Sequence, residues 1–315
     1  MKKPLIILTG PTSVGKTKLS IDLAKAVDAE IISADSIQVY KQMNIGSAKI
    51  TTEEMQGISH HLIDVLEPNE AFHVARFKEM ALEAMEGIYK RNRIPILVGG
   101  TGFYIQALLY DIDFTQTKED TTYRQELEQM AKVQGAEYLH DMLRRVDVVS
   151  ADTIHPNNVK RVIRALEYFK ETKTPISKHN EVQRQNESPY AFAYFVLEDM
   201  RERLYERINE RVDKMIEAGL VEEVRALQKK GLRRDLVSMQ GIGYKEIYAY
   251  LDKECSLEEA IEQIKLDTRH FAKRQITWFK REKEVTWVNK QEFEYDDTRI
   301  LQHLLEVMRE REIIR

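Results

Sequence analysis

The chain has 315 residues, of which 43% are hydrophobic and 32% are charged, and its formal net charge is −4. This length and composition allow a sizeable buried core, so they exclude a disordered or fibrous protein and fit one large domain or a core with an inserted lobe. The small negative charge argues against a protein that coats nucleic acid indiscriminately, and the single cysteine excludes an internal disulfide framework and a multi-cysteine zinc site.

The first predicted elements alternate between short apolar runs, typical of buried strands, and segments in which apolar residues recur at helical spacing. They are strands at 5–9, 30–33 and 94–98 and helices at 16–27, at 72–91 and from Phe103 onward. Such an alternation predicts an α/β fold with a doubly wound parallel sheet, whose ligands bind at the carboxyl ends of the strands.

The sequence changes character between residues 113 and 189, where charged, helix-forming segments show little strand signal. We therefore predict that residues 1–112 and 190–315 form a P-loop α/β core and that residues 113–189 form an inserted helical domain.

After this insertion the core resumes with a strand at 191–197. Asp199 is predicted to N-cap the following helix, and Gly219 and Gly231 are predicted to cap helix C-termini. A further helical stretch covers residues 256–281.

The sequence also indicates where the protein resides. No apolar run approaches the roughly 20 residues that span a bilayer, and the first residues lead straight into a glycine-rich motif instead of a cleavage site. We therefore expect a cytoplasmic protein with no membrane contact.

The strongest motif is GPTSVGKT, which matches a P-loop in full and lies between a predicted strand and a predicted helix. Backbone N–H groups, the helix N-terminus and the Lys16 ammonium would bind a polyphosphate, and the Thr17 hydroxyl would bind Mg²⁺. The motif does not say which polyphosphate is bound. It consists of Gly10, Pro11, Thr12, Ser13, Val14, Gly15, Lys16 and Thr17.

One interpretation of the P-loop is an ATP-dependent small-molecule kinase or NTPase. Asp64, at the end of the run HHLID, would then complete the Mg²⁺ site. The adjacent His60 and His61 have no third metal ligand at a useful spacing, so we interpret them as polar loop or packing residues.

Two further segments follow predicted strands at the same sheet edge as the P-loop. Asp35 follows the second strand, where its carboxylate would act as an acid or base, although an aspartate there is also a good helix cap. The run Gly99–Gly102 follows the third strand. Its small residues would let a substrate approach closely, and the Thr101 hydroxyl would be a donor.

Positive charge is concentrated in two segments. Seven lysines and arginines face three glutamates between His155 and Arg184, and seven face two acidic residues between Lys265 and Lys283. Such runs are usually solvated helix faces, so on their own they indicate nucleic-acid binding only weakly.

Several of these motifs, taken in order along most of the chain, resemble one family: the tRNA dimethylallyltransferases, also called isopentenylpyrophosphate transferases. The departures are small and conservative, such as Ile37 where family members often have methionine. The matching motifs are GPTSVGKT (10–17), ADSIQVYKQMNIGSAK (34–49), HHLID (60–64), PILVGGTGFYIQALL (95–109), HPNNVKRVIRALE (155–167), GLVEEV (219–224), GIGYKE (241–246) and TRHFAKRQITWF (268–279).

The resemblance implies transfer of the dimethylallyl group from dimethylallyl diphosphate, with Mg²⁺, to N6 of the adenosine 3′ of the anticodon, position 37. The expected substrates are tRNAs that read codons beginning with U, and the products are N6-dimethylallyladenosine and diphosphate. Asp35 matches the position of the base, while Lys16, Thr101, Arg211 and the Thr17-bound Mg²⁺ would stabilise the leaving group. Arg207, four residues before Arg211 on the same helical face, would share that role.

The resemblance also implies contacts with the tRNA anticodon stem-loop, whose target adenine would be flipped into a channel that leads to the P-loop. The basic segment around Lys160 would bind phosphates and make affinity salt-dependent. The segment with Arg269, Lys273 and Arg274 would line either RNA or the diphosphate pocket. The implied tRNA contacts are Asp35, Ser36, Ile37, Gln38, Thr101, Tyr123, Lys160, Arg161, Arg164, Gln240, Gly241, Gly243 and Lys245.

The sequence leaves two more functions open besides the transferase and the kinase. A non-catalytic RNA-binding module would leave the P-loop and Asp35 unexplained. An adenylate isopentenyltransferase, which acts on free nucleotides, would not need the basic helical insertion. We expect a monomer, because tRNA itself supplies the large interface.

Overall fold

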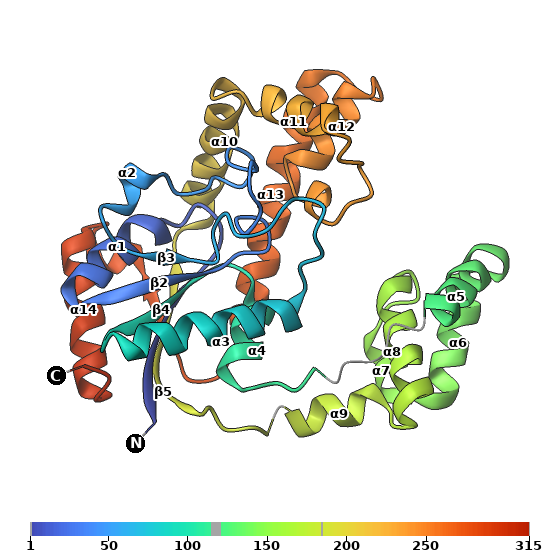
Figure 1. The fold of residues 1–315 in the computed structure, drawn as a ribbon, viewed down its shortest axis with the longest axis horizontal. Helices are drawn as coiled ribbons and strands as arrows, with labels where there is room; N and C mark the ends of the chain where they lie inside the picture. Colours follow the sequence, from blue (N-terminus) through green and yellow to red (C-terminus); the bar gives the residue numbers. More distant parts are fainter. Residues whose placement is uncertain (1, 115–120, 184, 315) are drawn as a thin grey trace. The chain divides into compact units, whose positions relative to one another are not determined.

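The fold is built on a six-stranded sheet in which every strand pair is parallel (Figure 1). The computed structural model describes residues 2–114, 121–183 and 185–314. The strand order is β3-β2-β4-β1-β5-β6. The strands are β1 (Lys3–Thr9), β2 (Ala29–Ala34), β3 (His60–His61), β4 (Ile94–Gly99), β5 (Tyr190–Glu198) and β6 (Val285–Asn289).

Helices cover both faces of this sheet, as the prediction of a doubly wound α/β fold requires. Along β1, Ile6 and Leu8 pack into one apolar cluster with residues of α1 (Lys16–Ala26) and α14 (Asp297–Glu310). Leu5 and Ile7 alternate with them, are equally inaccessible to solvent, and therefore point to the opposite face. A strand that is apolar on both sides is typical of a buried parallel sheet, and the predicted fold class is confirmed.

The chain divides into two compact units, and the larger one consists of Met1–Leu109 and Pro189–Arg315. It contains the sheet and the longest helices. Its remaining helical elements are α2 (Thr52–Met55), α3 (Val74–Lys90), α4 (Gly102–Leu109), α10 (Arg201–Glu217), α11 (Leu220–Lys229), α12 (Tyr244–Leu251), α13 (Leu257–Phe279) and the 3-10 helices η1 (Ser238–Gln240) and η2 (Lys290–Phe293).

The smaller unit, Tyr110–Ser188, consists in its described part of helices joined by turns, and it has its own apolar cluster that includes Leu127, Leu143 and Val162. The sequence predicts the domain change after residue 112, whereas the units change after Leu109, where α4 ends. Arg184, which belongs to the first basic segment, lies outside the described residues. The helices are α5 (Thr121–Gln134), α6 (Ala136–Val146), α7 (Val148–Thr153), α8 (Val159–Thr172) and α9 (Ile176–Gln183).

Helix ends in the larger unit differ from the sequence-based expectation by one residue. The N-cap of α10 is Met200 and not Asp199, whose carboxylate accepts a hydrogen bond from the Met200 N–H at 2.8 Å. The C-caps of α10 and α11 are Ala218 and Lys230; Gly219 and Gly231 follow them with φ of 98° and 82°. The glycines therefore supply the left-handed residue just beyond each cap.

The sequence patterns missed the last part of the chain. β6 and α14 follow the last predicted helix, and α14 completes the apolar cluster on the α1 face of the sheet. His60 and His61, interpreted as polar loop or packing residues, form the two-residue edge strand β3, where His61 Nε2 lies 2.7 Å from the buried Glu30 carboxylate.

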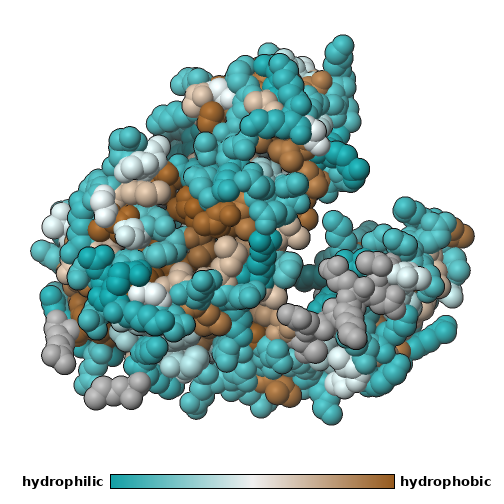
Figure 2. Space-filling view, in the orientation of Figure 1, coloured by the Kyte–Doolittle hydropathy of each residue, from teal (hydrophilic) through white to brown (hydrophobic). Residues whose placement is uncertain are grey.

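The surface of the molecule is mainly hydrophilic on the face shown in Figure 2, with apolar residues gathered in the middle of the larger unit. None of the helices in the described ranges has the length and hydropathy of a membrane span.

Candidate active site

The loop that matches the P-loop motif connects β1 to α1, as predicted, and its backbone is specialised. Gly10 and Gly15 have φ of 141° and 101°, which L side chains rarely adopt, and a Cβ on Gly10 would lie 2.5 Å from the Leu197 carbonyl oxygen. Ser13 also has a positive φ of 64°, and its buried hydroxyl has no hydrogen-bond partner in the part of the chain that the structure describes. Because buried polar groups are normally paired, this hydroxyl is available to a polar ligand at the loop.

Lys16 lies over this loop, where its Nζ donates to the carbonyl oxygens of Gly10 (3.0 Å) and Pro11 (2.7 Å). Burial and the Arg211 guanidinium lower the pKa of Lys16 to about 7, and the Asp35 carboxylate acts in the opposite direction. Burial also lowers the pKa of Arg211, again against the effect of Asp35. Lys16 and Arg211 are therefore both partly desolvated and close enough to Asp35 to feel its charge, an arrangement that suits a polyanion beside a proton acceptor.

Short contacts join the ends of β1, β2 and β4. The Thr9 hydroxyl donates to the Gly99 carbonyl at 2.6 Å, and the Thr101 N–H donates to the Ala34 carbonyl at 3.3 Å. The strand register also places Gly99 beside both Thr9 and Ala34. Thr101 and Asp35 therefore lie at one sheet edge with the P-loop, as the sequence predicts.

The glycines of residues 99–102 serve a different purpose from the one expected. A Cβ on Gly99 would lie 2.2 Å from the Ala34 carbonyl oxygen, and one on Gly100 would lie 2.0 Å from Nε2 of Gln275. A Cβ on Gly102 would lie 2.2 Å from the Trp278 ring. The small residues admit protein atoms from β2 and α13, and the expectation that they make room for a substrate is wrong for these three positions.

Gln275 is a site residue that the sequence analysis missed. It is 6% exposed, accepts a hydrogen bond from the Thr12 N–H at 2.8 Å and donates to the Gly100 carbonyl at 3.0 Å. Its charged neighbours Lys273 and Arg274 were the residues predicted to line RNA or the diphosphate pocket, and both are exposed. Its place in the motif TRHFAKRQITWF was the available signal.

Two more cations approach the P-loop from its Gly15 side. A Cβ on Gly15 would lie 3.6 Å from Nη2 of Arg207 and 3.1 Å from Nζ of Lys290. The spacing of Arg207 to Arg211 predicted that it would help to stabilise the leaving group. Lys290 was not predicted, because it follows the strand β6, which the sequence patterns missed. Lys290 is buried and pairs with Asp297 at 3.5 Å.

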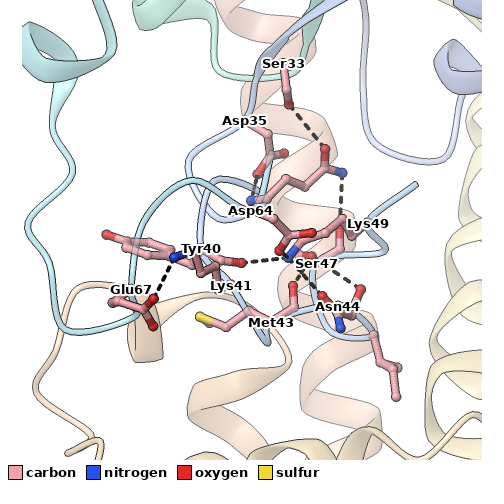
Figure 3. A network of polar contacts seen from close by, with 12 residues as sticks. Ser33, Asp35, Tyr40, Lys41, Met43, Asn44, Ser47, Lys49, Asp64 and Glu67 are labelled. Carbon is pink, nitrogen blue, oxygen red and sulfur yellow. Dashed lines mark hydrogen bonds and ion pairs between the residues drawn. The ribbon is translucent and has the colours of Figure 1, made fainter. Parts of the chain in front are cut away.

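Asp35 begins a segment, residues 35–49, that is held by polar contacts from its own side chains (Figure 3). The Asp35 Oδ1 accepts from the N–H groups of Ile37 (2.8 Å) and Gln38 (3.1 Å), so the residue caps a turn and not a helix. Both bonds use one oxygen, so Oδ2 can accept a further hydrogen bond. The Gln38 side chain accepts from the Ser33 hydroxyl at 3.2 Å and donates to the Ser47 carbonyl at 3.3 Å.

The predicted tRNA contacts of residues 240–245 lie against this segment. A Cβ on Gly241 would lie 3.2 Å from the Ile37 side chain. Gln240 and Lys245 have partners inside the protein: Gln240 Nε2 donates to the Arg234 carbonyl at 2.6 Å, and Lys245 pairs with Asp267 at 2.8 Å.

The other predicted tRNA contacts belong to the smaller unit. Lys160 and Arg161 are exposed on the first turn of α8, and Arg164 is half-buried one turn later. Tyr123 lies on α5, where the Lys170 ammonium is 3.7 Å from the centre of its ring. Arg269, in the larger unit, donates to the Asn209 side chain at 2.7 Å.

The geometry does not favour Asp64 as the metal-binding aspartate of a kinase. It follows β3, which β2 and β4 separate from β1, and its carboxylate pairs with Lys49 at 2.5 Å. Asp35, in contrast, follows β2 at the same sheet edge as the P-loop.

Known proteins resemble the chain over its full length. A model of the IPP transferase family matches residues 38–282. The tRNA dimethylallyltransferase of Lachnoclostridium phytofermentans is 61% identical over 313 residues, which are 99% of this chain and 100% of that protein.

Solved structures agree with these sequence matches. The crystal structure of the full-length tRNA isopentenylpyrophosphate transferase from Bacillus halodurans has a TM-score of 0.74 at 44% identity, covering 99% of this chain and 98% of that one. A eukaryotic dimethylallyltransferase acting on tRNA has a TM-score of 0.78 at 30% identity, covering 92% of this chain and 74% of that one. The chain belongs to the IPP transferase family.

Proposed function

We propose that this enzyme transfers the dimethylallyl group of dimethylallyl diphosphate to N6 of adenosine 37, 3′ of the anticodon, in tRNAs that read codons beginning with U. The products are N6-dimethylallyladenosine and diphosphate. The observation that carries the proposal is the convergence of Lys16, Arg211 and Asp35, whose charges act on one another at the P-loop edge of the sheet. Lys16 and Arg211 would bind the diphosphate, and Asp35 would accept the proton that the nucleophile must lose.

In the proposed reaction N6 of adenine forms a bond to the allylic carbon, and the bond from that carbon to the diphosphate oxygen breaks. The N6 lone pair is delocalised into the ring, so removal of its proton by Asp35 Oδ2 as the bond forms assists the attack. Negative charge grows on the departing diphosphate, which Lys16, Thr101 and Arg211 would stabilise together with the P-loop N–H groups.

The residues present fit Mg²⁺ as a cofactor. Among the described residues no group of three or more His, Cys, Asp and Glu could hold a metal ion by itself. Mg²⁺ often binds through few protein ligands and completes its shell with substrate phosphates and water. Thr17, exposed at the start of α1, would supply the protein ligand. Bound there, the ion would neutralise charge on the leaving diphosphate.

The tRNA would be bound by both units. Residues 36–38 and 240–245 of the larger unit flank Asp35 and would contact the flipped adenosine, whereas Lys160, Arg161 and Arg164 would bind phosphates of the anticodon stem. In this proposal the enzyme acts as a monomer in the cytoplasm.

The test is incubation with Mg²⁺, radiolabelled dimethylallyl diphosphate and unmodified tRNA, with ATP hydrolysis measured in parallel. The wild type should transfer label to tRNA, and Asp35→Asn should lower the rate about 10²–10⁴-fold while still binding diphosphate. The matched control Asp28→Asn, an exposed position beside β2, should behave as wild type. ATP consumption without label transfer would instead support a P-loop kinase.

A further inference from the structure

A carboxylate on α11 holds the Asp35 segment (residues 35–49) from outside the reacting centre. Glu223 Oε2 accepts hydrogen bonds from the N–H groups of Asn44 (2.9 Å) and Ile45 (2.8 Å), and its Oε1 accepts one from Gly46 (3.1 Å). Three successive backbone N–H groups that converge on one carboxylate form a nest, an arrangement that favours negative charge.

Tyr244, at the start of α12, fixes this carboxylate in place. Its hydroxyl donates to Glu223 Oε1 at 2.8 Å, and its ring is fully buried. Burial and the neighbouring Glu223 raise the pKa of Tyr244 well above its usual value, so the hydroxyl stays protonated and remains a donor. A Cβ on Gly46 would lie 2.6 Å from the Tyr244 ring, so the segment and the ring are in direct contact.

The anchored turn is connected to Asp35 through the contacts shown in Figure 3. Asn44 accepts at its carbonyl from the Lys49 N–H (2.9 Å), and its side chain accepts from Lys49 Nζ (2.9 Å). The Ser47 and Ala48 carbonyls accept from Gln38 Nε2, at 3.3 and 3.4 Å. The Gln38 N–H in turn donates to Asp35. A displacement of residues 44–46 therefore reaches Asp35 through the backbone and Gln38.

We infer that Glu223, held by Tyr244, is a positioning residue for prenyl transfer, which sets the place of Asp35 by anchoring residues 44–46. This inference rests on the proposed function, in which Asp35 takes the N6 proton. The P-loop has separate supports in Gln275 and Lys16, so the diphosphate site does not depend on the Glu223 anchor.

The anchor predicts a specific kinetic signature. A misplacement of about 1 Å in a reacting group lowers a rate by about 10²-fold. Glu223→Gln turns an amide NH₂ toward backbone N–H groups, and we expect kcat to fall about 10–100-fold while the KM for dimethylallyl diphosphate changes less than about twofold. Tyr244→Phe, which keeps the ring against Gly46, should cause a smaller loss of kcat in the same direction.

The matched control is Glu222→Gln. Glu222 is the preceding residue of α11, is 69% exposed at its side chain, and pairs with Arg225 within the same helix. Single-turnover rates per active enzyme, with sites counted by diphosphate binding, separate a positioning role from a general loss of folded protein. Amide hydrogen exchange of residues 35–49 reports the anchor without any reliance on activity.

Loss of amide protection at residues 44–46 together with a lower single-turnover rate in Glu223→Gln, and neither change in Glu222→Gln, is the expected result. A wild-type rate per active site in Glu223→Gln, or unchanged amide protection, would overturn the inference. If the wild type transfers no label to tRNA, the proposed function is wrong, and the positioning of Asp35 for prenyl transfer is overturned with it, whatever the exchange data show of the anchor.

Discussion

Gln275 accepts a hydrogen bond from the Thr12 N–H at 2.8 Å, so that a side chain of α13 is bonded to the P-loop 263 residues earlier in the sequence. The other end of the same amide donates to Gly100 at 3.0 Å. The two contacts together fix the orientation of the amide, because the Thr12 N–H can only donate and the Gly100 carbonyl can only accept. Gln275 therefore couples the loop after β1 to the loop after β4.

Replacing this amide should weaken the diphosphate site. Gln275→Leu leaves the Thr12 N–H and the Gly100 carbonyl without their partner, and each buried unpaired group costs about 1–3 kcal/mol. We expect the KM for dimethylallyl diphosphate to rise at least about tenfold in steady-state assays. Gln302→Leu, the same change at an exposed position of α14, should leave the KM unaltered. Equal KM values for the two variants would show that the bridge does not support the site.

Lys16 should take up a proton when diphosphate binds. Its pKa of about 7 in the free enzyme leaves it largely neutral at pH 8, and a diphosphate beside Nζ favours the charged form. Binding at pH 8 should therefore take up about one proton per site, whereas at pH 6 Lys16 is already protonated and should contribute almost none. Calorimetric titration of diphosphate in buffers of different ionisation enthalpy measures this number.

The control for this titration is Lys16→Arg, which keeps the positive charge but stays protonated at both pH values. The part of the proton uptake that Lys16 contributes, about one proton more at pH 8 than at pH 6, should disappear in this variant, which leaves only the ionisation of the diphosphate itself. If it persists, another group near the P-loop is the one that titrates.

Sequence patterns were sufficient for the parts of the site whose chemistry is local. A P-loop is defined by eight consecutive residues, and Asp35 follows a strand whose apolar run is plain, so both could be placed at the sheet edge. Gln275 and Glu223 could not be assigned to the site from the sequence, because each is one polar residue among many on a charged helix. The backbone groups that they bind lie 175 or more residues away in sequence.

The same limit explains the misread glycines. A glycine in a loop after a strand indicates a close approach, but the sequence does not say whether a ligand or the protein makes it. At Gly100 the approaching group is the Gln275 amide, and at Gly102 it is the Trp278 ring. The strand β6 was missed for a related reason: its five residues carry little periodic signal, and pairing with β5 stabilises them.

Lys160 and Arg161, exposed on the first turn of α8, should contribute to tRNA binding but not to the binding of dimethylallyl diphosphate. Lys160→Gln and Arg161→Gln each remove one charge that would lie against a phosphate. We expect the tRNA affinity to fall and the slope of log affinity against log salt to decrease by about 0.7–0.9 per contact. The KM for dimethylallyl diphosphate should not change.

Filter binding of unmodified tRNA over a range of KCl concentrations measures this slope. Lys173→Gln is the matched control, because Lys173 is exposed at the C-terminal cap of the same helix. A decrease in slope as large in Lys173→Gln as in Lys160→Gln would point to a general charge effect and against a specific phosphate contact.

Glu30 should stabilise the fold in a pH-dependent way, at the end of β2 opposite to Asp35. Its side chain is 2% exposed and accepts hydrogen bonds at 2.7 Å from Nε and Nη2 of Arg91, while His61 Nε2 lies at the same distance. The Arg91 contacts, the largest cause, lower the pKa of Glu30 to about 2, although burial acts against them. Because the folded-state pKa is lower than the unfolded one, the stabilisation is present above about pH 4.5 and is lost as the pH falls toward 2.

Glu30→Gln should therefore lower the free energy of unfolding by about 2–3 kcal/mol at neutral pH, and by roughly half as much at pH 3. Urea unfolding at several pH values between 3 and 7 measures both. Glu86→Gln, which removes an exposed pair with Lys90, should change the free energy of unfolding far less than Glu30→Gln at every pH, because solvent screens such pairs. If the Glu30→Gln deficit is the same at pH 3 and pH 7, the charge on Glu30 is not the source of the stabilisation and packing of its side chain is.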